Sequence, residues 1–201
     1  MKRRQCDPRS VSTSEQRTLA QAVRASGGLV GALCLVELTD WGLSTFFHAS
    51  QSGLDSWGIV PRTKRGLLGI LFSPLLHANV EHLLANALPL FVLLSLLFWD
   101  RRYRPMPTLA CIWLVSGLGT WLIGRGNAVH IGASSLIYGL VAFLITAGMA
   151  LKSWRPAVIA ILVLLFYGGL FYGVLPRQGP ISWEGHLCGA LAGILAARWN
   201  R

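Results

Sequence analysis

The stretch PLLHANVEHLLANALPLFVLLSLLF, residues 74–98, decides what kind of fold this sequence can adopt. It is apolar over a length that suffices to cross the hydrocarbon core of a bilayer as a helix, which takes about 20 residues. Its first half nevertheless carries His77, His82 and Asn86. Polar side chains at membrane depth are costly and usually face the interior of a helix bundle. The stretch therefore predicts a membrane helix that turns a polar face toward its neighbours.

The rest of the chain has the same character. Of its 201 residues, 53% are hydrophobic and only 13% are charged, whereas a soluble domain has about a quarter charged residues. Short polar or Pro/Gly-containing breaks separate six apolar stretches, at about residues 28–47, 74–98, 107–123, 133–151, 157–175 and 185–199. The sequence predicts an all-α membrane protein, with a basic N-terminal arm over residues 1–26 and a six-helix domain over residues 27–201.

Basic residues outnumber acidic residues, 18 to 8, and their positions indicate an orientation. They form no basic stripe of the kind that binds nucleic acid, so we expect no nucleic-acid partner. If the N-terminus is cytosolic, thirteen basic residues lie on the inner side and five on the outer side, as the positive-inside rule requires. The outer five are Arg62, Lys64, Arg65, Arg125 and Arg177. Both termini are then cytosolic.

The longest outer connection, residues 48–73, follows the first apolar stretch. It contains Trp57, Gly58 and Pro61 in a partly apolar setting. Two interpretations stay open: the connection lies in the membrane interface, or it is an ordinary surface loop.

Two further apolar stretches begin with polar residues. The fourth begins Gly132-Ala-Ser-Ser-Leu-Ile-Tyr-Gly139, which places Ser134 and Tyr138 one helical turn apart. The sixth begins Gly185-His-Leu-Cys-Gly-Ala-Leu-Ala-Gly193, in which His186 is followed by a small-residue face. Such a face lets a neighbouring helix approach closely. Since both stretches begin on the outer side, we expect His186 to meet Ser134.

A serine beside a histidine at membrane depth is a candidate for nucleophilic catalysis. A serine hydroxyl needs an adjacent base to take its proton, and an imidazole is the usual base. The oxyanion that forms needs hydrogen-bond donors. The N–H groups at the start of the helix that carries Ser134 could supply them, together with His82 and Asn86. The constellation thus contains a nucleophile, a base and an oxyanion hole.

The combined motifs resemble those of the rhomboid family of intramembrane serine proteases. That pattern is H-x4-H-x3-N in the second helix, G-x-S-G with an aromatic residue four positions after the serine, and H-x2-G-x3-G in the sixth helix. The corresponding residues here are His77, His82 and Asn86, then Gly132, Ser134 and Tyr138, then His186, Gly189 and Gly193. The resemblance covers about residues 28–199.

The resemblance implies a six-helix fold, a Ser134–His186 dyad and a serine endopeptidase that needs no metal or other cofactor. His82 and Asn86 would stabilise the oxyanion, Tyr138 would pack on the base, and His77 would support the site. Two departures stand out: Ser135 replaces the usual Gly, and no Trp-Arg pair lies at the family's place in the first outer connection, where Trp57 is near a basic cluster. We expect Glu184 to be a solvated residue after a Ser182 N-cap, not a third catalytic acid.

The expected substrates are single-span membrane proteins, cut in or near the outer part of the bilayer, and the expected location is a bacterial plasma membrane. One alternative is an inactive rhomboid-like protein that binds membrane clients. Another is a small transporter with His82, Asn86 and Glu37 along a polar path, and a specialised sorting protease is a third. Glu37 and Asp40 could also be structural hydrogen-bonding groups.

Other chemistries are disfavoured by the motifs. The order Glu81-His82 does not match a zinc H-E-x-x-H motif, and Asp40 is the one intramembrane Asp where an aspartyl protease needs two. No Gly-rich phosphate loop is present, so we expect no nucleotide partner. We expect His48 and His130 to be solvated or interfacial.

Overall fold

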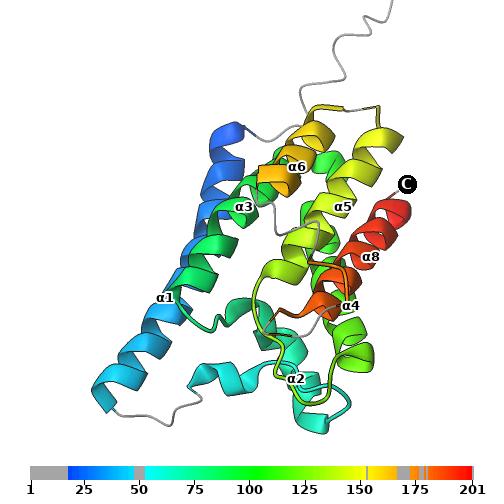
Figure 1. The fold of residues 1–201 in the computed structure, drawn as a ribbon. Helices are drawn as coiled ribbons and strands as arrows, with labels where there is room; N and C mark the ends of the chain where they lie inside the picture. Colours follow the sequence, from blue (N-terminus) through cyan, green and yellow to red (C-terminus); the bar gives the residue numbers. More distant parts are fainter. Residues whose placement is uncertain are drawn as a thin grey trace, which may run out of the picture.

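The computed structural model describes residues 18–47, 53–152, 154–166, 173–176, 179 and 181–200, and this part of the chain is helical without a β-strand (Figure 1). The helices are α1 Leu19–Phe47, α2 Lys64–Phe72, α3 Val80–Trp99, α4 Pro105–Ile123, α5 Ser134–Ala150, α6 Trp154–Phe166 and α8 Trp183–Trp199. Short 3₁₀ turns occupy Leu54–Trp57, Ser73–Leu75 and Arg101–Tyr103. The predicted all-α class is confirmed.

Three helical segments within the described ranges are long and apolar enough to cross a membrane, namely Leu19–Leu43, Val80–Trp99 and Arg101–Ile123. The apolar helices Ser134–Ala150 and Trp154–Val163 are shorter. The exact count of six spans and the cytosolic location of both termini therefore stay predictions.

Several predicted boundaries differ from the observed helices, and the two largest differences are at α1 and α6. Helix α1 begins at Leu19 instead of residue 28, and residues 1–17 of the expected basic arm lie outside the described residues. The expected fifth stretch, residues 157–175, corresponds to α6 only as far as Phe166. Residues 167–172 are outside the described part of the chain.

The packing places α8 against both α4 and α5, while α1 lies at the edge of the bundle against α3 (Figure 1). The core is apolar, with Leu93, Leu97 and Phe143 fully buried. Large apolar side chains also cover the exterior, including Leu35 on α1 and Leu88 on α3. An apolar exterior around an apolar core is what a bilayer requires of a membrane domain.

The connection after α1 contains a helix where the sequence left a surface loop possible. Helix α2 buries Gly66, Gly69 and Ile70 and leaves Leu67, Leu68 and Leu71 about half exposed. A short helix with an apolar outer face suits the membrane interface, which is the first of the two interpretations. The carboxyl-terminal end of α1, α2 and the first residues of α5 and α8 lie at the same end of the bundle (Figure 1).

The α5–α8 contact is the most extensive between helices and depends on glycines. A Cβ atom at Gly189 would collide with the carbonyl oxygen of Ser135, and a Cβ atom at Gly193 would collide with that of Gly139. No side chain fits at either position without separating the two backbones. This close approach is what the small-residue face of the sixth stretch predicted.

We predict that Gly193→Ala destabilises the protein by about 1–3 kcal/mol, because the added methyl group forces α8 away from α5. The matched control is Gly31→Ala on α1, where nothing lies within 4 Å of an added Cβ. Thermal unfolding in detergent measures both variants. Equal midpoints for the two would contradict the close-contact explanation.

Acidic side chains gather where α1 meets the turn Leu54–Trp57. An Asp40 carboxylate oxygen, Oδ1, accepts a hydrogen bond from the Leu54 N–H at 2.7 Å, which identifies Asp40 as a structural hydrogen-bonding group. Glu37 is buried on the same helix. Burial, together with the charges of Asp40 and Glu37, raises the pKa of Asp55 to about 6. Ionising Asp55 therefore costs more free energy in the folded protein than in the unfolded chain.

We predict that Asp55→Asn stabilises the protein near neutral pH. In the unfolded chain an Asp side chain ionises near pH 3.9, whereas Asp55 in the folded protein ionises only near its raised pKa. The free energy of unfolding of the wild type therefore falls as the pH rises between these two values. The variant should unfold at a higher temperature than wild type at about pH 7.5 and at the same temperature at about pH 3.5. A difference independent of pH would refute the assignment.

Candidate active site

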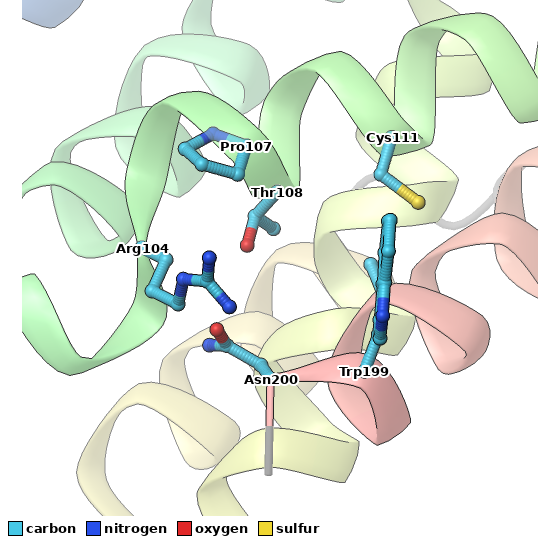
Figure 2. A pocket seen from close by; sticks show the side chains of 7 residues that line it. Arg104, Pro107, Thr108, Cys111, Trp199 and Asn200 are labelled. Carbon is cyan, nitrogen blue, oxygen red and sulfur yellow. The ribbon is translucent and has the colours of Figure 1, made fainter.

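One cavity of the described protein lies away from the predicted site residues. It has a volume of about 180 Å³ and opens between the first turns of α4 and the end of α8 (Figure 2). Its walls are Arg104, Pro107, Thr108, Cys111, Ala196, Trp199 and Asn200. None of these is a predicted catalytic residue, and α8 carries His186 at its other end.

Ser134 and His186 meet at the end of the bundle where their helices begin. Ser134 is the first residue of α5, and His186 lies in the first turn of α8. Ser134 Oγ is 2.8 Å from His186 Nε2. Ser134 is half-buried, and the His186 side chain is buried. The structure thus brings together the two residues predicted to react.

The second nitrogen of His186 determines which tautomer faces the serine. His186 Nδ1 is 2.9 Å from the carbonyl oxygen of Gly173. A carbonyl can only accept, so Nδ1 carries the hydrogen and donates it there. Nε2 is then unprotonated and accepts from the Ser134 hydroxyl. This is the arrangement that a general base requires, with a backbone carbonyl in the orienting position.

Tyr138 lies against the imidazole of His186, as predicted. The two rings are stacked, with centroids 4.2 Å apart and an interplanar angle of 17°. Tyr138 reaches this position because it follows Ser134 by one turn of α5. The ring limits the rotation of the imidazole and presents a π face to it.

His82 and His77 pack around the residues before Ser134. Gly132 has φ = 107°, and a Cβ there would lie 2.7 Å from His82 Cε1, so only glycine fits. His77 is buried, and its Nε2 accepts from the Ala133 N–H at 3.4 Å. The two histidine rings meet edge to face, 5.1 Å apart. Together they support the turn that presents Ser134.

Asn86 is buried one turn after His82, and its amide donates to the His82 carbonyl oxygen at 2.7 Å. The amide has a second N–H. Helix α5 begins after Ala133, which provides no side-chain cap. Its first N–H groups are therefore not used by a capping side chain. The roles of His82 and Asn86 as oxyanion donors stay predictions.

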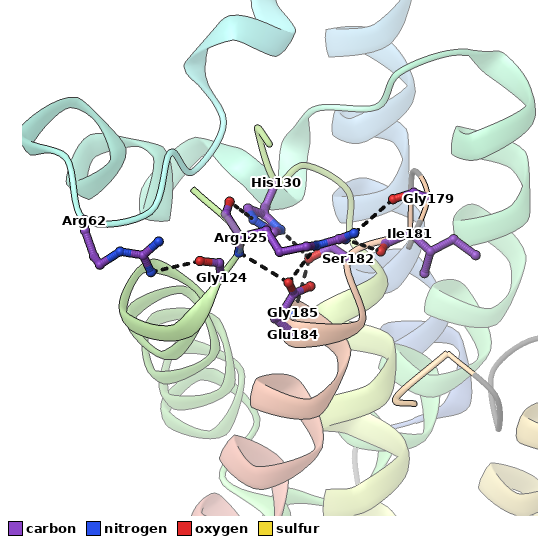
Figure 3. A network of polar contacts seen from close by, with 9 residues as sticks. All are labelled: Arg62, Gly124, Arg125, His130, Gly179, Ile181, Ser182, Glu184 and Gly185. Carbon is purple, nitrogen blue, oxygen red and sulfur yellow. Dashed lines mark hydrogen bonds and ion pairs between the residues drawn. The ribbon is translucent and has the colours of Figure 1, made fainter. Parts of the chain in front are cut away.

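The expectation that Glu184 is solvated was wrong, although the predicted N-cap residue, Ser182, was correct. Ser182 accepts from the Gly185 N–H as expected. The side chain of Glu184, however, is only 1% exposed and forms an ion pair with Arg125 at 2.8 Å (Figure 3). Glu184 is buried because the connection between α4 and α5 folds over the start of α8, which is a feature of the tertiary structure. The carboxylate is paired with Arg125, which agrees with excluding it as a third catalytic acid.

The expectation that His130 is solvated or interfacial was also wrong, because its side chain is only 4% exposed. His130 Nε2 is 3.3 Å from the Arg125 carbonyl oxygen and Nδ1 is 2.6 Å from Ser182 Oγ (Figure 3). Nε2 therefore donates to the carbonyl and Nδ1 accepts from the serine hydroxyl. Burial lowers the pKa of His130, which favours this neutral form. His48 lies outside the described residues.

Sequence reasoning missed two features of the site, the Gly173 carbonyl that binds His186 and the Arg125–Glu184 ion pair. The Gly173 carbonyl carries no signal in the sequence, because any residue has one. Arg125 and Glu184 did carry a signal, since they are opposite charges predicted on the same side of a chain with few charges. In this setting opposite charges are candidates for pairing.

The chain is similar in sequence to a known domain family and to several other proteins. The Rhomboid domain family matches residues 64–199. An uncharacterized protein of Mycobacterium tuberculosis is 45% identical over 176 residues, which cover 84% of this chain and 70% of that protein. An uncharacterized protein of Mycobacterium leprae is 41% identical over 174 residues, 82% of this chain and 66% of that protein.

A more distant relative carries a family name. A protein of Acanthamoeba polyphaga mimivirus, named "Putative rhomboid protein", is 29% identical over 141 residues, which cover 66% of this chain and 75% of that protein. No solved structure matches the chain significantly. The matched range, residues 64–199, contains every residue of the three motifs. The chain belongs to the rhomboid family.

Proposed function

We propose that this protein is an intramembrane serine endopeptidase with Ser134 as nucleophile and His186 as general base. The observation that carries the proposal is the 2.8 Å contact from Ser134 Oγ to His186 Nε2, with Nδ1 bound to the Gly173 carbonyl. That tautomer can take the serine proton. A purely structural serine would not require an orienting partner on the far side of the imidazole.

In the proposed mechanism, Ser134 Oγ attacks the carbonyl carbon of the scissile peptide bond while His186 Nε2 takes the hydroxyl proton. The oxyanion is stabilised by N–H groups at the start of α5 and by His82 and Asn86. The imidazolium then protonates the leaving amine, and the C–N bond breaks. The acyl group stays on Ser134 as an ester until water hydrolyses it.

Water needs access to that ester, and a narrow cavity borders Ser134. It has a volume of about 20 Å³, which is room for about one water molecule. Its walls include the hydroxyl-bearing residues Ser73, Ser116 and Thr120. Hydrogen-bonding groups of this kind hold water in an otherwise apolar protein. The cavity supports a hydrolytic outcome for the acyl-enzyme.

The proposed substrates are single-span membrane proteins cut in or near the outer part of the bilayer. The apolar exterior supports a membrane location for the protein. The site lies at the end of the bundle that holds α2, and thirteen of the 18 basic residues are assigned to the other end by the positive-inside rule. We therefore propose a bacterial plasma membrane in which the site opens to the outer side.

We predict that the purified protein in detergent cleaves a model transmembrane substrate, and that Ser134→Ala and His186→Ala each lower the rate by at least about 10³-fold. A fluorophosphonate probe should label wild type at Ser134. The matched control is Ser135→Gly, which restores the usual family residue and should cleave at close to the wild-type rate. Cleavage by both alanine variants would refute the dyad.

Absence of both cleavage and labelling in wild type would favour the alternative, a rhomboid-like protein that binds membrane clients without cutting them. Comparative membrane proteomics of cells carrying wild type or Ser134→Ala would then separate the two. Shed ectodomains that disappear with Ser134→Ala support the protease.

We predict that Tyr138→Leu lowers kcat by about tenfold, because the imidazolium loses the π face that stabilises it. Tyr138→Phe keeps the stacked ring and should retain most of the activity. Steady-state cleavage rates measure both variants. Similar losses in both would show that the tyrosine hydroxyl matters and the stacking does not.

A further inference from the structure

A polar network beside the dyad fastens the start of α8 to the connection between α4 and α5 (Figure 3). Arg125 is its centre. Its Nη2 donates to the Ile181 carbonyl oxygen at 2.7 Å and its Nη1 to that of Gly179 at 3.2 Å. Its Nε and its backbone N–H both donate to Glu184 Oε1, at 2.8 and 3.3 Å. One residue thus binds Gly179 and Ile181 before α8 and Glu184 in its first turn.

Burial makes the Arg125–Glu184 pair strongly dependent on both partners. The side chain of Glu184 is 1% exposed and that of Arg125 is 28% exposed. A buried carboxylate that loses its partner is left with an uncompensated charge, which is far more costly than losing a surface ion pair. The first turn of α8 therefore stays attached to Arg125 for as long as both partners of the ion pair are present.

A second contact fixes the same turn from the side of α5. Ser182 Oγ donates to His130 Nδ1 and accepts from the Gly185 N–H, so it links the N-cap of α8 to the connection before α5. His130 in turn donates to the Arg125 carbonyl oxygen. The side chain of Arg125 therefore contacts the first turn of α8 directly, at Glu184. Its backbone carbonyl is connected to the same turn through His130 and Ser182.

That first turn carries His186, two residues after Glu184. The His186 ring is bound at one end by Ser134 and at the other by the carbonyl of Gly173. Neither contact fixes the helix that supports the ring. An error of about 1 Å in the placement of a reacting group can cost about 100-fold in rate. The placement of the first turn of α8 therefore bears directly on the distance over which the proton is transferred.

We propose that Arg125 and Glu184 are positioning residues that set the approach of His186 to Ser134 by fastening the first turn of α8 to the connection before α5. The proposal rests on the proposed protease function. Glu184 does not act as a third member of a catalytic triad, because its carboxylate faces Arg125 and the Gly173 carbonyl binds the Nδ1 hydrogen of His186.

The experiment compares Arg125→Gln and Arg125→Lys with a matched control, Arg102→Gln. Arg102 belongs to the other ion pair among the described residues, with Asp100 at 2.6 Å, and lies in the connection between α3 and α4 away from the dyad. For each protein, kcat and KM are measured on the model substrate, and the rate of fluorophosphonate labelling is measured without substrate. All assays run well below the unfolding midpoint of each variant.

Arg125→Gln should lower kcat by about tenfold or more and slow labelling in parallel, with KM little changed, because the dyad and not the substrate contact is disturbed. Arg125→Lys should restore part of the loss, since an ammonium can pair with Glu184 but cannot also reach both carbonyls. Arg102→Gln should retain wild-type kcat and labelling. A merely structural role would lower the unfolding midpoint without this selective loss of kcat.

Glu184 supplies a second, independent test. Because Glu184→Gln removes the charge that Arg125→Gln leaves unpaired, the double variant should be more stable than Arg125→Gln alone, and its kcat loss should be less than the product of the two single losses. This variant also serves where Arg125→Gln folds poorly. If the wild type is active and both Arg125→Gln and the double variant keep the wild-type kcat, the positioning role is overturned and the proposed protease function is not. A wild type that neither cleaves nor labels overturns both proposals.

Discussion

The close approach of α5 and α8 is the constraint on which the site depends. Gly189 and Gly193 leave no room for a Cβ against the carbonyl oxygens of Ser135 and Gly139. Since hydrophobic burial offers little drive between helices inside a membrane, close backbone packing has to supply much of the attraction. The same contact brings the first turn of α8 beside the first residue of α5. The two glycines thus set how closely α8 lies against α5, and the contact between Ser134 and His186 depends on that approach.

Three polar contacts in this apolar molecule join connections to helix ends that are distant along the chain. Asp40 binds the N–H of Leu54, Arg125 pairs with Glu184, and His130 binds Ser182. In a low-dielectric setting an unpaired polar group is costly, so breaking any of these contacts between a connection and a helix end costs free energy. They all lie toward the end of the bundle that holds Ser134. The rigidity that a reacting pair needs is thus supplied by the connections as well as the helices.

Much of the fold could be predicted from hydropathy and capping residues. The helix boundaries differ from the expected stretches where a cap intervenes: α3 begins at Val80 because Asn79 caps it, although the apolar run begins at Pro74. Helix α8 begins at Trp183 because Ser182 caps it. The helix in the connection after α1 was not singled out, since its buried side is mostly glycine and carries little hydrophobic signal.

The sequence by itself determined the all-helical membrane class, the three motifs and the pairing of Ser134 with His186, because the period of the helix and the rarity of polar residues leave few other arrangements. Only the tertiary structure decided the tautomer of His186, the burial of His130 and the pairing of Glu184 with Arg125. Those features depend on a backbone carbonyl at Gly173 and on how the connections fold back over α8. Spacing along the chain carries no information about either, because the partners are far apart in sequence and meet only when the bundle is packed.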